Sequence, residues 1–343
     1  MDYVNFLESK ALTANAKGLS SVGDCNPILF PFQRDIVKWA LRRGRSCIWA
    51  DCGMGKTFMQ LEWIRQIPGR RIIVAPLNVC RQTILEAQKL GMEIQFSKKP
   101  IDGCNIQITN YESLAAFEGI EYDGVALDES SILKNFTGKI RNQILDQFGS
   151  TRFKLACTAT PAPNDYMELG NHAEFVGAMS RTEMLSMFFV YDGGDTSKWR
   201  IKGHAQGEFW KWVSSWAVML RKPSDIGYDD GSFVLPALNL AQHIVQSETP
   251  MDGFLIPMPA SSLQERRVAR KQSIDERVQL AASLADGNQW VFWCNLNTES
   301  AALAKSIGAV EVSGSTPEDE RERICQGFLD GSIQYVVTKP SLW

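Results

Sequence analysis

The sequence predicts an α/β fold in which a parallel sheet carries a phosphate-binding loop and a second α/β unit follows. Two observations support this expectation. Short apolar runs that are typical of buried strands alternate with helix-forming segments between residues 46 and 157. Polar residues follow these runs directly, and in open α/β sheets the carboxyl ends of the strands are where ligands bind.

The composition is that of an ordinary globular protein. The chain has 343 residues, 44% of them hydrophobic and 22% charged, so two domains are the natural expectation. A net charge of −3 gives no general preference for nucleic acid, so any such surface has to be local. The eight cysteines form no C-x-x-C pair and no zinc pattern. Without a signal sequence or a membrane-spanning apolar run, we expect no membrane association and a cytoplasmic location.

The run Ala50-Asp-Cys-Gly-Met-Gly-Lys-Thr57 lies between a predicted strand at 46–50 and a predicted helix at 58–67. Strand, glycine-rich turn and helix are the context of a phosphate-binding loop. Ala50 stands where the usual pattern has its first glycine, and a chance Gly-Lys-Thr turn is the alternative. The sequence thus predicts a P-loop NTPase fold, with ATP contacts from Gly53, Met54, Gly55, Lys56 and Thr57.

Each P-loop residue type has a physical role. The glycines let backbone N–H groups turn toward phosphate oxygens, and the helix that follows adds its partial positive charge. Lys56 is expected to reach the β- and γ-phosphates, and Thr57 to bind Mg²⁺. Upstream, Gln33 precedes a predicted helix at 35–41. Its amide both donates and accepts, so it can read an adenine edge, although a solvated glutamine is the alternative.

Further strands are predicted at 71–75, 105–109, 124–127 and 153–157. The strand at 124–127 ends in Asp128 and Glu129. We expect Asp128 to hold Mg²⁺ through water, and Glu129 to orient and deprotonate an attacking water. Acidic residues are also common at loop starts, which is the alternative interpretation.

Residues 164–250 break the alternation of strands and helices. Helical spacing there predicts a helix formed around Phe209, Trp212, Val213, Trp216 and Leu220. We favour an apolar helix face packed on the core. The alternative is an aromatic surface that stacks on bases and includes Trp199 and Trp210.

A second α/β unit is predicted toward the C-terminus. Strands are expected at 290–294, 309–312 and 334–338, and a helix at 317–329. Before them, residues 261–286 form one long helical pattern. Its basic residues are interpreted as a solvated face rather than a phosphate-binding surface; they are Arg266, Arg267, Arg270 and Lys271.

Together these motifs resemble the superfamily 2 helicases, in particular the Swi/Snf-like branch with its DEAD/DEAH-box-like motifs and its compact phage and prophage forms. The resembling segments are 32–34 (Q motif), 50–57 (motif I), 75–77 (Ia), 109–113 (Ib), 128–131 (II), 158–161 (III), 220–223 (the link between lobes) and 291–295 (IV). Ser131 stands where motif II of that branch has a histidine.

The resemblance implies a motor that couples hydrolysis of ATP with Mg²⁺ to movement on nucleic acid, with double-stranded DNA expected. It implies an N-terminal extension (1–25), a RecA-like ATP-binding lobe (26–165), a helical linking segment (166–258) and a partial RecA-like second lobe (259–343). It also assigns roles to individual residues: Arg34 beside Gln33 at the nucleotide, Thr158 and Thr160 in coupling, and Asn110 and Tyr111 as DNA contacts. For a phage product, the location is the host cytoplasm.

Residues 336–343 resemble only the entry to motif V, and motif VI with its arginine fingers is not found. We therefore expect a truncated second lobe, or one that a protein partner completes, and stronger ATP binding than hydrolysis. Two alternatives stay open. One is a module that binds ATP and DNA without translocating, and the other is a P-loop kinase acting on a small metabolite.

Overall fold

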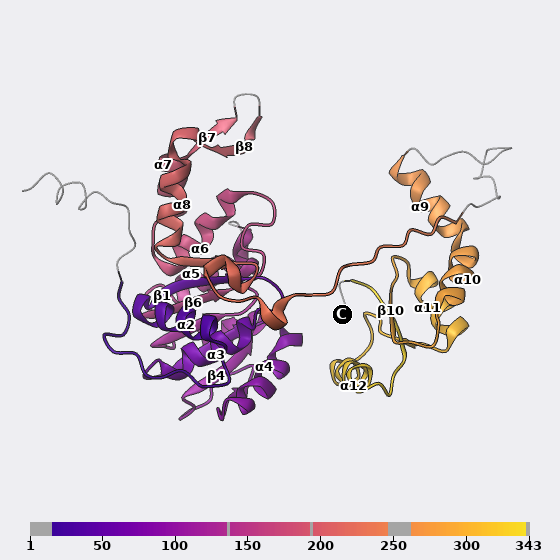
Figure 1. Cartoon of the computed structure of the whole chain (residues 1–343), viewed down its shortest axis with the longest axis horizontal. Coiled ribbons are helices and arrows are strands. Elements are labelled where there is room, and N and C mark those ends of the chain that lie inside the picture. The colour runs from indigo at the N-terminus through magenta and orange to yellow at the C-terminus, as the bar shows by residue number, and fades with distance from the viewer. Residues whose placement is uncertain (1–15, 136–137, 193–194, 246–261, 341–343) are drawn as a thin grey trace, which may run out of the picture. The chain divides into compact units, whose positions relative to one another are not determined.

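The computed structural model describes residues 16–135, 138–192, 195–245 and 262–340. The chain divides into two compact units, Met1–Pro236 and Ala237–Trp343 (Figure 1). Most of the expected N-terminal extension lies outside the described residues. Most of the expected linking segment, up to Pro236, belongs to the first unit.

A seven-stranded parallel sheet forms the centre of the first unit, in the order β3-β4-β2-β5-β6-β1-β9. Five of its strands are buried along nearly their whole length, as expected of a sheet covered on both faces. The strands are β1 (Arg45–Ala50), β2 (Arg71–Ala75), β3 (Gln95–Phe96), β4 (Ile106–Asn110), β5 (Gly124–Leu127), β6 (Phe153–Cys157) and β9 (Ala217–Leu220).

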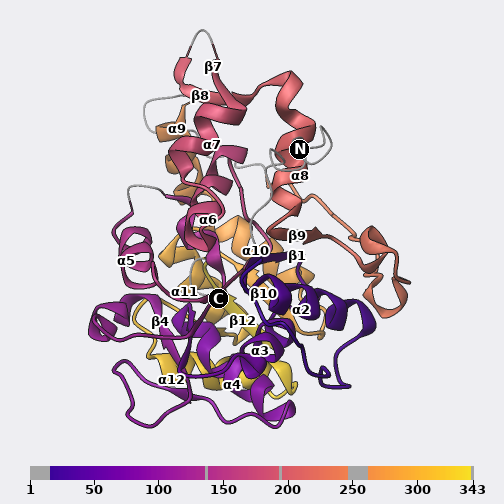
Figure 2. The same ribbon diagram turned by 90° about the vertical axis from the view of Figure 1, so that its left-hand side faces the viewer.

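The helices of the first unit lie on both faces of this sheet. They are α2 (Pro31–Arg43), α3 (Lys56–Gln66), α4 (Leu77–Lys89), α5 (Lys139–Gln147), α6 (Leu169–Val176), α7 (Arg181–Phe188) and α8 (Gln206–Ser214). Short 3-10 helices are η1 (Tyr111–Phe117), η2 (Ser130–Lys134), η3 (Tyr166–Glu168), η4 (Gly203–Ala205), η5 (Pro223–Ile226) and η6 (Gly231–Phe233). An antiparallel hairpin, β7 (Phe189–Asp192) with β8 (Asp195–Ile201), stands beyond α7 and α8 at the end away from the sheet (Figures 1 and 2).

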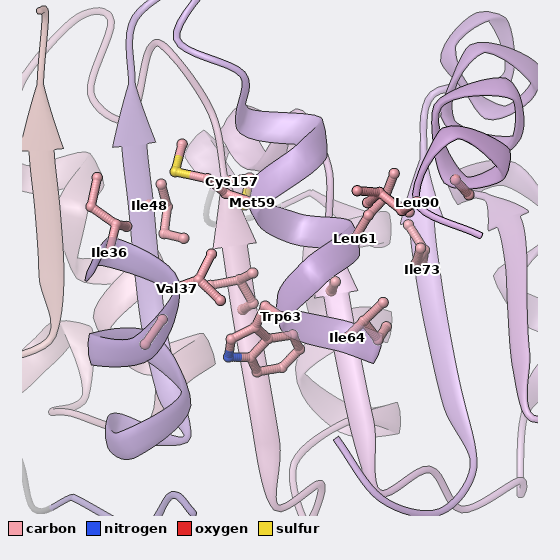
Figure 3. Close-up of a cluster of buried hydrophobic side chains, with 14 of the residues drawn as sticks. Ile36, Val37, Ile48, Met59, Leu61, Trp63, Ile64, Ile73, Leu90 and Cys157 are labelled. Carbon is pink, nitrogen blue, oxygen red and sulfur yellow. The ribbon is translucent and has the colours of Figure 1, made fainter. Parts of the chain in front are cut away.

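Two hydrophobic clusters hold these layers together, one on each face of the sheet. Alternating side chains of β1 enter opposite clusters: Ile48 joins α2, α3 and α4, whereas Trp49 joins α6, α7 and α8. Figure 3 shows Ile48 in the first cluster with Val37 of α2 and Trp63 of α3. β1, which leads into the P-loop, is therefore fixed by packing on both sides.

The expected helix through Leu220 is wrong in its last part. α8 ends at Ser214, and Ala217–Leu220 forms strand β9, which pairs in parallel with β1. A short apolar run is compatible with a strand or a helix, and here its pairing with the free edge of β1 makes it a strand. The favoured packing interpretation is confirmed for the helix itself, because Phe209 and Trp212 are buried in the core.

The second unit contains the expected α/β arrangement. Its parallel sheet has the order β10-β12-β11, and its strands are β10 (Trp290–Trp293), β11 (Val310–Glu311) and β12 (Tyr335–Thr338). Its helices are α9 (Leu263–Gln272), α10 (Ile274–Leu284), α11 (Asn297–Ile307) and α12 (Glu318–Leu329). The single helix expected at 261–286 is two helices that meet at Ser273. In the described part of the chain, no helix is long and apolar enough to cross a membrane.

Candidate nucleotide site

The P-loop lies at the carboxyl end of β1 and runs into the N-terminus of α3. Gly53 and Gly55 adopt left-handed backbone angles, with φ of 80° and 75°, which L side chains rarely adopt. A Cβ on Gly55 would also lie 2.3 Å from Nε2 of Gln33. The backbone angle therefore favours glycine at Gly55, and any Cβ there would also have to displace the end of the Gln33 side chain. Its backbone N–H groups and the start of α3 form the usual cradle for an anion.

Lys56 folds over the loop. Its Nζ donates to the carbonyl oxygens of Ala50 at 2.9 Å and Asp51 at 3.1 Å. These are bonds that phosphate oxygens would replace, because an ammonium group prefers a charged acceptor. Thr57 follows on α3 and is half-buried.

Gln33 reaches the P-loop from α2 and is only 4% exposed. Its Nε2 donates to the carbonyl of Met54 at 2.9 Å, and its Oε1 accepts from the backbone N–H of Phe30 at 2.9 Å. The amide thus ties the Q-motif segment to the loop. Arg34 instead closes the start of α2, where its Nε donates to the carbonyl of Leu29 at 2.8 Å.

Asp128 follows β5 and is buried. Its Oδ1 accepts the backbone N–H of Glu129 at 3.0 Å. Burial, and then the neighbouring charge of Glu129, raises the pKa of the Asp128 carboxyl to about 6, while Lys56 acts in the opposite direction. A buried carboxylate of this kind is suited to a cation, which would remove the cost of its charge.

Glu129 has a left-handed backbone, with φ of 47°, and no other non-glycine residue in the described ranges has a positive φ. Such a conformation costs about 1–2 kcal/mol for an L residue. Its Oε2 lies 3.4 Å from the hydroxyl of Thr158, which also accepts the backbone N–H of Thr160 at 3.1 Å. Because β6 lies between β5 and β1, Thr158 lies between the acidic pair and the P-loop.

The structure does not support Asn110 and Tyr111 as nucleic-acid contacts, because both side chains are buried. The Tyr111 hydroxyl donates to the carbonyl of Asp128 at 2.6 Å, so it braces the acidic pair. Asn110 donates to Glu112 at 2.7 Å and accepts from Ser113 at 2.6 Å. The Ib-like segment is therefore internal at these two positions.

Sequence reasoning also missed His172 of α6. Its Nε2 lies 3.1 Å from the hydroxyl of Ser130, directly behind the acidic pair. Both residues are fully buried. A lone histidine in an apolar helix carries no sequence signal of this contact.

The residues present fit a nucleotide with Mg²⁺. The donor set combines backbone N–H groups, an ammonium, a threonine hydroxyl and one buried carboxylate. No group of three or more His, Cys, Asp and Glu residues within the described ranges could hold a metal by itself. This suits Mg²⁺, which binds through one or two carboxylates, phosphate oxygens and water.

Among the hollows formed by the described residues, two that lie outside this site have linings of interest. In the first unit, a groove of about 560 Å³ lies directly after the motif III segment, and its lining includes Asn164, Tyr166, Phe189, Trp199, Arg200 and Gln206. In the second unit, a pocket of about 330 Å³ lies at the carboxyl ends of β11 and β12, and its lining includes Ser300, Glu311, Ser313, Gly314 and Lys339.

No family model matches the sequence. The putative protein p41 of Acyrthosiphon pisum secondary endosymbiont phage 1 is 27% identical over 210 residues, which are 52% of this chain and 44% of p41. The chain thus matches less than half the length of that relative. Among solved structures, the Sulfolobus solfataricus SWI2/SNF2 ATPase core in complex with dsDNA is similar, with a TM-score of 0.52 and 15% identity over 94% of this chain and 80% of that one. The chain therefore has a RecA-like α/β fold, as the SWI2/SNF2 ATPase core does.

Proposed function

We propose that this chain is an ATP-dependent DNA translocase or helicase of the Swi/Snf-like type. The observation that carries the proposal is the meeting of three motifs on adjacent strands β5, β6 and β1. Glu129 contacts Thr158, and Asp128 interacts electrostatically with Lys56. The likeness of fold to an ATPase core that was solved with dsDNA supports it, as does the partial likeness to a phage protein.

Each residue then has a defined task. Lys56 exchanges the carbonyls of Ala50 and Asp51 for phosphate oxygens. Thr57 and Asp128 would hold Mg²⁺, which would neutralise charge on the phosphates of the nucleotide. Glu129 orients the attacking water and accepts its proton. Gln33 fixes the position of the loop relative to α2, since its amide donates a hydrogen bond to the carbonyl of Met54.

The groove after motif III supports a local nucleic-acid surface on a chain whose net charge is −3. Tyr166 is 52% exposed there and packs edge-on against Trp210, with ring centroids 5.2 Å apart. Exposed aromatic rings stack on bases without regard to sequence. Arg200 in the same lining carries the charge that phosphates require.

The first test is steady-state ATP hydrolysis, measured with and without single- and double-stranded DNA. We expect double-stranded DNA to raise the rate of ATP hydrolysis. We expect the variant Glu129→Gln to show no hydrolysis with or without DNA. Glu118→Gln, at an exposed glutamate of the same unit, is the matched control. Bound ATP without any turnover would favour a module that binds but does not translocate, and phosphate transfer to a small acceptor would favour a kinase.

Lys56→Ala tests the P-loop itself. We expect the variant to lose ATP binding in titration calorimetry, because the ammonium group is the principal positive charge of the loop. Lys89→Ala, at an exposed lysine ending α4, should bind ATP as the unaltered chain does. Unchanged ATP affinity in Lys56→Ala would overturn the assignment of the site.

A further inference from the structure

Helix α6 contacts both ends of η2, the short helix that directly follows Glu129. At the start of η2, His172 Nε2 lies 3.1 Å from the Ser130 hydroxyl. At its end, the amide of Asn171 donates to the carbonyl of Lys134 at 3.0 Å. Two consecutive residues of α6 therefore hold the turn that carries the acidic pair.

Hydrophobic packing alone does not explain a histidine in this position. His172 is fully buried, and its ring packs edge-on against Trp49 of β1 with centroids 5.5 Å apart. Its Nδ1 has no hydrogen-bond partner among the described residues. Burying a polar group without a partner costs free energy that a leucine or phenylalanine would not cost. The Ser130 contact is the compensating polar interaction that the structure gives for this histidine.

Histidine serves this contact in its neutral form. Burial lowers the pKa of the imidazole to about 4, so the ring carries no charge near neutral pH. A neutral imidazole adds no charge next to Asp128 and Glu129. It can pair with the serine hydroxyl as donor or as acceptor.

The turn needs such support because Glu129 is strained. Its φ of 47° persists only if its neighbours impose it. On one side, Tyr111 bonds the carbonyl of Asp128. On the other side, His172 bonds Ser130. The glutamate is therefore held between two buried anchors that come from different elements.

We propose that His172 is a positioning residue for Glu129. Through Ser130 it holds the left-handed turn that directs the glutamate toward Thr158 and the P-loop. This inference rests on the proposed function, since it assigns His172 a part in ATP hydrolysis. It makes two claims: the turn loosens without His172, and the loosened turn slows the chemical step without weakening ATP binding.

The test compares His172→Phe, which keeps an aromatic ring and loses the polar contact, with His172→Gln, which replaces the imidazole with an amide that can still donate or accept a hydrogen bond. We expect His172→Phe to lower kcat about tenfold, the loss of roughly one buried hydrogen bond, with little change in the KM for ATP. His172→Gln should recover much of that loss. Ser130→Ala should match His172→Phe, and the double variant should be no slower than either single one.

A matched control separates positioning from general stability. Ser215 is also buried, and its hydroxyl donates to the carbonyl of Trp212 at 2.7 Å, away from the acidic pair. Ser215→Ala should lower the melting temperature and leave kcat unchanged. If kcat falls in Ser215→Ala as it falls in Ser130→Ala, or if the effects of Ser130→Ala and His172→Phe add fully, the proposal is overturned.

A second readout does not depend on turnover. Hydrogen–deuterium exchange of the peptide spanning 128–135 should quicken in His172→Phe and Ser130→Ala, and stay slow in Ser215→Ala. If the unaltered chain binds ATP but does not hydrolyse it, the proposed function fails while this exchange still decides whether His172 holds the turn. Unchanged exchange in His172→Phe refutes the inference even in an active enzyme.

Discussion

At the scale of single residues, Asp128 is the position where the fold and the proposed chemistry oppose each other. Its carboxyl is buried at the end of β5, and burial with the charge of Glu129 raises its pKa to about 6. The folded chain therefore binds a proton there more tightly than the unfolded chain does. Without a cation, the stability that this proton gives is complete below pH 3.8 and is lost as the pH rises through about 6.

The variant Asp128→Asn tests this loss of stability at neutral pH, because asparagine does not ionise. Without nucleotide or metal, we expect the variant to be more stable than the unaltered chain at pH 7, by up to about 3 kcal/mol, and equally stable near pH 4. Urea unfolding at the two pH values measures the difference. With ATP and Mg²⁺ the order should reverse, because the variant lacks the carboxylate that is proposed to hold the metal. A variant that is less stable at pH 7 without ligand would contradict the account of Asp128.

At the scale of elements, β9 supports the P-loop from the edge of the sheet. Its terminal Leu220 accepts the backbone N–H of Asp51 at 3.0 Å, so the first residue after β1 is fixed by β9. Trp216, just before β9, is fully buried and packs edge-on against Trp49 of β1 and against Trp212 of α8. The segment after motif III thus completes the sheet that carries the candidate nucleotide site.

Trp216→Ala tests this support. We expect it to destabilise the first unit by about 3–5 kcal/mol, because a large fully buried ring leaves a cavity. Urea unfolding followed by circular dichroism measures the change. Trp293→Ala is the matched control, since Trp293 of β10 is 52% exposed and should cost little. Equal losses in the two variants would argue against a core role for Trp216.

At the scale of the whole molecule, all the candidate nucleotide residues belong to the first unit, which has its own two cores. The second unit has separate, smaller clusters around β10, β11 and β12. We therefore expect ligand to stabilise the first unit and to have little effect on the stability of the second.

Calorimetry of the full chain should therefore show two transitions. We expect ATP with Mg²⁺ to raise the transition that Trp216→Ala lowers, by the equivalent of about 2.7 kcal/mol at a ligand concentration of 100 Kd. The other transition should move little. If ligand shifts both transitions equally, the second unit takes part in binding, and residues of that unit belong to the candidate nucleotide site as well.

Features that depend on a contiguous stretch of sequence could be predicted, whereas features that depend on contacts between distant segments could not. The placement of the Gly-Lys-Thr loop after β1 and of Asp128-Glu129 after β5 was predictable, because each motif is contiguous and follows a strand. Strand β9 was not predictable, because a short apolar run is compatible with both a helix and a strand. Only its pairing with the free edge of β1 makes this run a strand. The roles of Tyr111 and His172 were not predictable either, because each depends on a partner that the fold brings from a distant segment. Gln33 lies between these cases: a role at the nucleotide was predicted for it, as a reader of the adenine edge, whereas its bond to Met54 of the loop was not.

The pairing of β1 has a consequence for synthesis. β1 ends at Ala50, yet its two neighbours in the sheet, β6 and β9, are made much later, and β9 ends at Leu220. Contacts between such distant segments form slowly, because a long loop must close before they stabilise anything. On the ribosome, one edge of β1 can pair once β6 has emerged, but the edge that β9 covers stays unpaired until residue 220 has emerged. A cell making this protein has to keep that edge from pairing with other chains during this interval, and the candidate nucleotide loop lacks the support of β9 until the interval ends.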